Sequence, residues 1–224
     1  MQLDGTWIAI DASCPQLQVA LLKNGTVTES IEVSAPAMEG MMSSIQQVCE
    51  RQQHRISETN GFLYGSGPGS ILGIRLSLMA IRTWATLHRI PSERILHFRS
   101  LAMACAQHRL TPDFSPNHPT LVCSEWKTNR WNVMIVHDPL AQSSIEVWSS
   151  DQLEAFDGKR LLLPQRKLWS QTPNFLQPIQ YQLDLLSHAD LRSELLHPSS
   201  PHWEIYTPDE TRYARWSGER HRAT

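Results

Sequence analysis

One stretch of this 224-residue chain reads Gly65-Ser66-Gly67-Pro68-Gly69-Ser70-Ile71-Leu72-Gly73-Ile74-Arg75. The apolar residues 62–64 before it predict a strand, and the apolar run after Ser70 predicts a helix that continues to about His88. Alternating glycines permit backbone conformations that other residues rarely adopt, and Ser70 is a favourable helix N-cap. The stretch therefore predicts a strand, a tight turn and a helix N-terminus that can hold an anion.

This glycine turn has two interpretations. It lacks the Gly-Lys-Ser/Thr of a Walker A loop, and a Gly-x-Gly after a strand is a weak signal alone. A structural turn is the first interpretation, and a phosphate cleft containing Gly67, Gly69 and Ser70 is the second. Asp11, which ends a predicted strand, is likewise either a turn residue or a carboxylate facing a phosphate-bound metal. These four residues form the candidate phosphate cleft.

Composition narrows the class of protein. The chain is 41% hydrophobic, which permits a substantial core, and its net charge of −2 argues against nucleic-acid binding by bulk charge. Its four cysteines include no Cys-x-x-Cys, and the N-terminus resembles no signal peptide. No apolar run reaches the ~20 residues of a membrane helix. We expect reduced thiols and a cytoplasmic protein that does not contact a membrane.

Hydrophobic periodicity predicts two halves, at residues 1–110 and 111–224. Each half opens with a β-β-β-α unit, and the turn-forming residues 111–119 separate them. Strands are predicted at 7–12, 18–22, 27–33, 62–64, 95–98, 120–125, 131–137, 144–148 and 159–163. Helices are predicted at 36–53, 70–88, 100–110, 151–156 and 183–196. The end of the chain is basic.

Two of the predicted helices carry more apolar surface than one sheet requires. In helix 36–53, Met38, Met41, Met42 and Ile45 recur at three- and four-residue steps. Helix 70–88 has one apolar side around Ile74 and Leu78. Its second apolar side contains Leu76, Ala80, Thr83 and Leu87, so we expect this side to meet the methionine-rich helix or another protein. A polar stripe of the same helix contains Arg75, Arg82 and Arg89. It is either a solvated edge or a site that binds phosphate or carboxylate.

Sequence motifs for catalysis are absent. The ten histidines include no His-x-x-x-His pair, and no Gly-x-Ser-x-Gly elbow is found. We therefore expect no metal site and no catalytic residues.

Two segments of the chain together form a recognisable pattern. The first segment is Ile8-Ala-Ile-Asp-Ala-Ser-Cys-Pro, followed by Val19 to Gly25. The second is Gly67-Pro-Gly-Ser-Ile-Leu-Gly-Ile-Arg75, followed by Ala80, Ile90-Pro91 and Ser100-Leu-Ala102. Together they resemble the TsaB (YeaZ) family, relatives of TsaD/Gcp proteins. The Asp-Ala-Arg motif that is usual in the second half of the family is replaced by Val122-Cys-Ser-Glu-Trp126. The chain thus resembles a divergent family member.

The resemblance implies an α/β fold of the actin and sugar-kinase type, with two RNase H-like halves. It implies a non-catalytic scaffold that pairs with a TsaD-like catalytic subunit for threonylcarbamoylation of the tRNA adenosine next to the anticodon. A TsaE-like ATPase joins that assembly, and tRNA is contacted only through it. Family members pair through the first two helices, so the expected interface residues are Met38, Met41, Met42, Ile45, Leu76, Thr83 and Leu87.

Other functions remain open at this point. The first alternative is a small ATP-binding kinase or ATPase, in which Glu125 supplies a second carboxylate and ATP or ADP is the cofactor; otherwise no cofactor is expected. The second is a metalloprotease, which the missing His-x-x-x-His disfavours. A homodimer is the alternative to pairing with TsaD.

Overall fold

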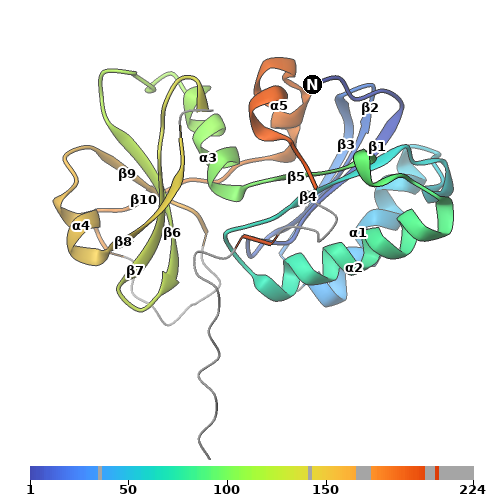
Figure 1. Cartoon of the computed structure of the whole chain (residues 1–224), viewed down its shortest axis with the longest axis horizontal. Helices are drawn as coiled ribbons and strands as arrows, with labels where there is room; N and C mark the ends of the chain where they lie inside the picture. Colours follow the sequence, from blue (N-terminus) through green and yellow to red (C-terminus); the bar gives the residue numbers. More distant parts are fainter. Residues whose placement is uncertain (35–36, 141–142, 165–172, 200–204, 207–224) are drawn as a thin grey trace, which may run out of the picture.

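The computed structural model describes residues 1–34, 37–140, 143–164, 173–199 and 205–206, which form two sheets and their covering helices (Figure 1). The strands of the first sheet are β1 (Thr6–Asp11), β2 (Leu17–Lys23), β3 (Thr26–Val33), β4 (Gly61–Gly65), β5 (Ile95–Phe98) and β11 (His197–Pro198). Those of the second sheet are β6 (Thr120–Lys127), β7 (Arg130–Ile135), β8 (Ile145–Ser149), β9 (Lys159–Leu162) and β10 (Gln177–Pro178).

The α-helices are α1 (Ala37–Arg51), α2 (Ile71–His88), α3 (Ser100–Arg109), α4 (Ser150–Ala155) and α5 (Ala189–Leu195). Short 3₁₀ helices lie at Ile56–Glu58, Ser92–Arg94 and Leu183–Ser187. No helix within the described ranges has the length and apolar character needed to cross a bilayer.

The two sheets repeat one strand order. The first runs β11-β5-β4-β1-β2-β3 and the second runs β10-β9-β6-β7-β8. In each, the opening strand pairs antiparallel with the next strand and parallel with the fourth, as β1 does with β2 and β4, and β6 with β7 and β9. This duplication confirms the predicted α/β fold with two halves that each open β-β-β-α.

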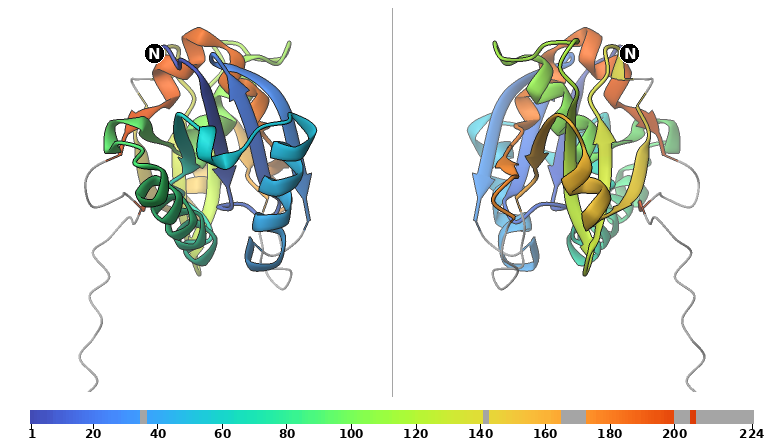
Figure 2. Two further views of the ribbon diagram at one scale, coloured as in Figure 1. Left: turned by 90° about the vertical axis from the view of Figure 1, so that its right-hand side faces the viewer. Right: turned by 90° about the vertical axis from the view of Figure 1, so that its left-hand side faces the viewer.

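Three hydrophobic clusters hold the layers together. One joins β1, β2 and β4 to α1 and α2, which lie side by side over one face of the first sheet (Figure 2). A second contains α3 and residues from both sheets, because α3 lies between them (Figure 1). The third lies on the opposite face of the second sheet, around Leu153 of α4.

The chain does not divide in sequence as predicted. Residues 181–198 return to the first sheet, where β11 pairs with β5, so residues 111–224 are not a separate half. Contacts between residues far apart in sequence fix this return. The Gln18 side chain, for example, bonds to Tyr181 O at 2.9 Å and to Leu183 N at 3.1 Å.

The predicted helix at 183–196 is also interrupted. It divides into the 3₁₀ helix Leu183–Ser187 and α5, with His188 extended between them. The buried Arg192 guanidinium donates to the Leu186 carbonyl, which a continuous helix would bond internally, and also to the Gly25 carbonyl of the β2–β3 turn. The basic residues 212–222 lie outside the described residues.

Candidate functional site

The glycine turn packs directly on the loop that follows β1. A side chain at Gly65 would overlap the Asp11 carboxylate, one at Gly69 the Ser13 carbonyl, and one at Gly73 the Ala12 carbonyl. Gly67 has φ +100°, a conformation that favours glycine. The glycines are therefore explained by the close approach of the Asp11 carboxylate and of two backbone carbonyls, and by the positive φ of Gly67.

Several polar groups at the helix end predicted to bind an anion form hydrogen bonds within the protein. Ser70 N donates to Ser13 O at 2.8 Å, and Gly73 N donates to Ser70 Oγ at 3.2 Å, which confirms Ser70 as the N-cap of α2. On the other side of the turn, Ser100 Oγ donates to Pro68 O at 2.6 Å. Two of the donors expected to face an anion are thus directed at protein oxygens.

Asp11 is fully buried, with 0% of its surface exposed. Its carboxylate accepts from Ser13 N at 2.9 Å, from Ser13 Oγ at 2.7 Å and from the Tyr181 hydroxyl. Burial, together with the nearby Asp11 charge, raises the pKa of Tyr181 well above its usual value, so this phenol remains a donor. These contacts favour a structural role for Asp11, as a link between β1 and the returning segment.

A cavity of about 220 Å³ lies where the two halves meet. Its walls come from the loop after β1, the glycine turn and the end of β6. The lining residues are Ser13, Cys14, Pro15, Pro68, Gly69, Ser70, Ser124, Glu125, Trp126, Leu163 and Pro164. Of the four predicted cleft residues, the cavity therefore contains Gly69 and Ser70, whereas Asp11 and Gly67 are not among its lining residues.

The charge of this cavity bears on its ligand. Glu125, the second carboxylate that a kinase would require, does line it. Among the described residues, the lining contains no lysine or arginine. Also among the described residues, no group of three or more His, Cys, Asp or Glu side chains is arranged to hold a metal.

A second cavity, of about 420 Å³, is lined by polar residues that include His97, Arg99, Glu194 and His197. His97 is 3% exposed, and its Nδ1 lies 3.1 Å from Ser66 Oγ. Burial, His197 and Arg99 lower the pKa of His97 to about 4. This ring is therefore neutral near pH 7, and its described contacts are those of a core histidine.

The outer face of α1 and α2 exposes an unusual number of large apolar side chains. Met38 (72% exposed) and Met42 (57%) lie on α1, whereas Met79 (65%) and Leu87 (68%) lie on α2. At 100° per residue, the α2 positions at the centre of this face fall on one stripe opposite the buried side. The face consists of Met38, Met42, Leu72, Leu76, Met79, Thr83 and Leu87, and we call it the helix-pair face.

The structure changes the predicted interface at both helices. Met41 (6% exposed) and Ile45 (3%) pack in the core, with Met41 Sδ accepting from Ser77 Oγ at 3.8 Å, so these two are removed from the surface set. Sequence reasoning missed Met79 and Leu72, although both fit the three- and four-residue spacing of Leu76, Thr83 and Leu87. It could not have found Tyr181, which reaches Asp11 across 170 residues of sequence.

Comparisons with known proteins agree with this geometry. Residues 32–136, just under half of the chain, match the family model of TsaD, tRNA N6-adenosine threonylcarbamoyltransferase. An uncharacterized protein with similarity to peptidase YeaZ from Pseudomonas aeruginosa has a TM-score of 0.63 at 15% identity, covering 90% of this chain and 99% of that chain. YeaZ from Pseudomonas aeruginosa has a TM-score of 0.60 at 18% identity, covering 85% of this chain and 96% of that chain.

These matches confirm the TsaD/Gcp-like resemblance and show that the fold is that of YeaZ. A glucokinase from an Antarctic psychrotroph reaches a TM-score of 0.36 at 14% identity, over 66% of this chain and 51% of that chain, a likeness too slight to carry an argument. Among curated protein sequences, none matches this chain.

Proposed function

From the TsaD-like region on a YeaZ fold, we propose that this chain is a non-catalytic scaffold subunit in threonylcarbamoylation of tRNA. It pairs with a TsaD-like catalytic subunit, and that subunit modifies the adenosine next to the anticodon. A TsaE-like ATPase completes the assembly, which acts in the cytoplasm and reaches tRNA through the catalytic subunit.

The helix-pair face is the observation that carries this proposal. Burying one methionine or leucine side chain contributes about 1.5–3 kcal/mol of stabilisation. Because several such side chains are exposed on one face of the isolated chain, a partner that buried them would gain a large binding free energy. Monomeric proteins seldom leave apolar patches of that kind open, and such patches mark interaction sites. A partner that covers α1 and α2 would realise this gain.

The contacts of Asp11 support a scaffold over an ATP-dependent enzyme. Its carboxylate is occupied by Ser13 and Tyr181, and Asp11 is not among the residues that line the adjacent cavity.

The test is retention of the full-length chain by an immobilised TsaD-like subunit from the same organism. Met42→Glu combined with Met79→Glu places two charges on the helix-pair face, at positions that are 57% and 65% exposed in the monomer. We expect this variant to fold normally and to lose retention by more than about 100-fold, because each buried, unpaired charge costs several kcal/mol. Leu110→Glu, at a 48% exposed position just after α3, is the matched control and should be retained like the native chain.

Undiminished retention of the doubly charged variant would contradict the proposed pairing.

The kinase or ATPase alternative is favoured by the shared cavity of Ser70 and Glu125 and has its own test. A calorimetric titration with Mg-ATP that gives binding heat, together with a rise in thermal stability, would support that alternative; the scaffold proposal predicts neither.

A further inference from the structure

The cavity of about 420 Å³ has no role in the proposed pairing. Its described lining residues include none from α1 or α2 and none that also lines the cavity of about 220 Å³. Part of its wall comes from β5, β11 and the start of α3, and part from β7, β8 and the loop between them, so the cavity touches both halves of the molecule. Its volume falls in the range of about 300–1,000 Å³ that is usual for small-molecule sites. We call it the α3 cavity.

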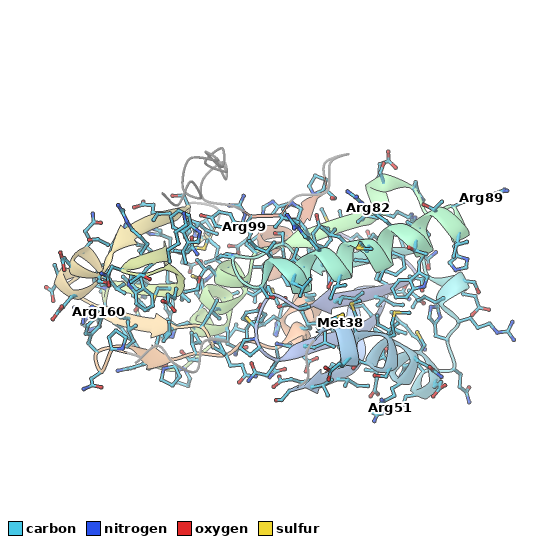
Figure 3. All side chains as sticks on the ribbon, turned by 90° about the horizontal axis from the view of Figure 1, so that it is seen from below. Met38, Arg51, Arg82, Arg89, Arg99 and Arg160 are labelled. Atoms are coloured by element: carbon cyan, nitrogen blue, oxygen red, sulfur yellow. The ribbon has the colours of Figure 1, made fainter. Side chains whose placement is uncertain are left out.

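Arg99 supplies a cationic group to the α3 cavity, where the two halves of the molecule meet (Figure 3). Its guanidinium carbon lies 5.5 Å from the centroid of the Tyr206 ring, which is a cation–π contact. This contact joins the charge of the guanidinium to the π-system of the ring and provides no oxygen acceptor for the five N–H donors. Among the described residues, no carboxylate forms an ion pair with Arg99. The planar fork of Arg99 is therefore suited to an incoming carboxylate.

The carboxylate of Glu194, which also lines the α3 cavity, is paired within the protein. Its Oε2 accepts from Arg109 Nη1 at 3.0 Å and from Leu140 N at 2.6 Å. Asp138, which also pairs with Arg109, is exposed and is not a lining residue, so water and salt screen its charge. The charge that the cavity offers to a ligand is therefore the positive charge of Arg99.

Another part of the wall is apolar. Met134 and Leu140 are buried in the core cluster that contains α3, and Ile145 packs against the same cluster. A ligand group that contacts these side chains gains about 25 cal/mol for each Å² of apolar surface removed from water. The α3 cavity thus combines one cationic fork with an apolar wall.

We propose that the α3 cavity binds a small organic carboxylate that carries an apolar group. The Arg99 guanidinium donates two parallel N–H bonds to the carboxylate, and the apolar group packs against Met134, Leu140 and Ile145. This site is additional to the proposed pairing with a TsaD-like subunit and does not depend on it.

Two other classes of ligand fit the α3 cavity less well. A phosphate ester carries up to two negative charges, whereas Arg99 is the single Lys or Arg among the described lining residues. An organic cation would be repelled by Arg99 and would have to displace Arg109 from Glu194. A monocarboxylate matches both the charge and the planar geometry of Arg99.

The experiment is a calorimetric titration of the full-length chain with sodium hexanoate at constant ionic strength. We expect a dissociation constant of about 1 mM or lower, and a rise of about 3 °C or more in the thermal unfolding midpoint at about 10 mM hexanoate. Hexanol and hexylamine, which have the same chain without the carboxylate, should bind at least tenfold more weakly. Equal binding of either, or no heat and no midpoint shift with hexanoate, would overturn the proposal.

Two substitutions test the site itself. Arg99→Gln should weaken hexanoate binding at least tenfold, and Ile145→Trp, at a partly exposed position, should block it by filling the cavity. Ile145→Trp keeps the test independent of the place of Arg99 as the N-cap residue of α3. Arg94→Gln is the matched control, because Arg94 also lies over an aromatic ring, 6.0 Å from the Trp7 centroid, and is not a lining residue. Native-like binding by both test variants, or an equal loss in the control, would overturn the proposal.

NMR spectroscopy locates the bound hexanoate. Burial, His197 and Arg99 lower the pKa of His97, so a carboxylate on Arg99 should offset part of this effect and raise the pKa of His97 above about 4. A chemical shift change at His97 that saturates with the calorimetric dissociation constant supports the site. Changes confined to Met42 and Met79 would show adsorption to the helix-pair face instead and would overturn the proposal.

Discussion

Replacing Tyr181 with phenylalanine removes one hydroxyl from a fully buried polar cluster. That hydroxyl donates to the Asp11 carboxylate, whose other two donors both come from Ser13. Tyr181 is 1% exposed, so the substitution changes little apolar burial and removes mainly this hydrogen bond, together with a longer contact to Cys14 Sγ at 3.7 Å. A hydrogen bond to a charged group contributes about 1.5–3 kcal/mol, and we expect the free energy of unfolding to fall by about 2 kcal/mol.

Urea unfolding followed by tryptophan fluorescence measures this change. With a slope of about 2 kcal/mol per molar urea, the midpoint should fall by about 1 M at unchanged slope. Asp11→Asn provides the control background, because a hydrogen bond to a neutral group contributes only about 0.5–1.5 kcal/mol. The Tyr181 substitution should therefore cost roughly half as much in that background. An equal cost in both backgrounds, or a midpoint shift below about 0.2 M in the first, would refute the link between Asp11 and the returning segment.

Two further predictions follow from the turn and from the second cavity. Gly69→Ala should lower the free energy of unfolding by about 2 kcal/mol or more, because its methyl group would overlap the Ser13 carbonyl; a urea midpoint like that of the native chain would contradict this packing. The His97 imidazole, with its pKa lowered to about 4, should show no NMR titration between about pH 6 and 8. The unfolded chain binds the His97 proton at higher pH than the folded chain does. The contribution of His97 to the free energy of unfolding should therefore fall as pH drops from about 6.5 to about 4. An NMR titration midpoint near 6.5 for His97 in the folded protein would contradict this prediction.

Local patterns predicted most of the elements because their signals are local. Asn24-Gly25 forms a hairpin turn with φ positive at both residues, and Ser70 caps α2, as their residue types indicate. The duplicated β-β-β-α order followed from strand length and periodicity. None of these features depends on contacts between distant parts of the chain.

The remaining features depend on distant contacts. Met38 and Met41 both fit the apolar repeat of α1, but one is 72% exposed and the other 6% exposed, because their burial depends on where the sheet and Ser77 of α2 lie. The two-residue strand β11 has no sequence signal of its own, and it forms where the returning chain meets β5. Asp11 could be assigned to a turn or to a cleft from sequence, and only the approach of Tyr181 distinguishes the two.

The most direct test of the scaffold proposal is the mass of the species formed when this chain is mixed with the TsaD-like subunit of the same organism. Light scattering after size exclusion measures that mass without relying on any substitution. The helix-pair face predicts a stable one-to-one complex in which amide exchange slows specifically in α1 and α2. Two unchanged peaks, with a monomer or a homodimer of this chain in its own fraction, would contradict pairing as the function of this protein.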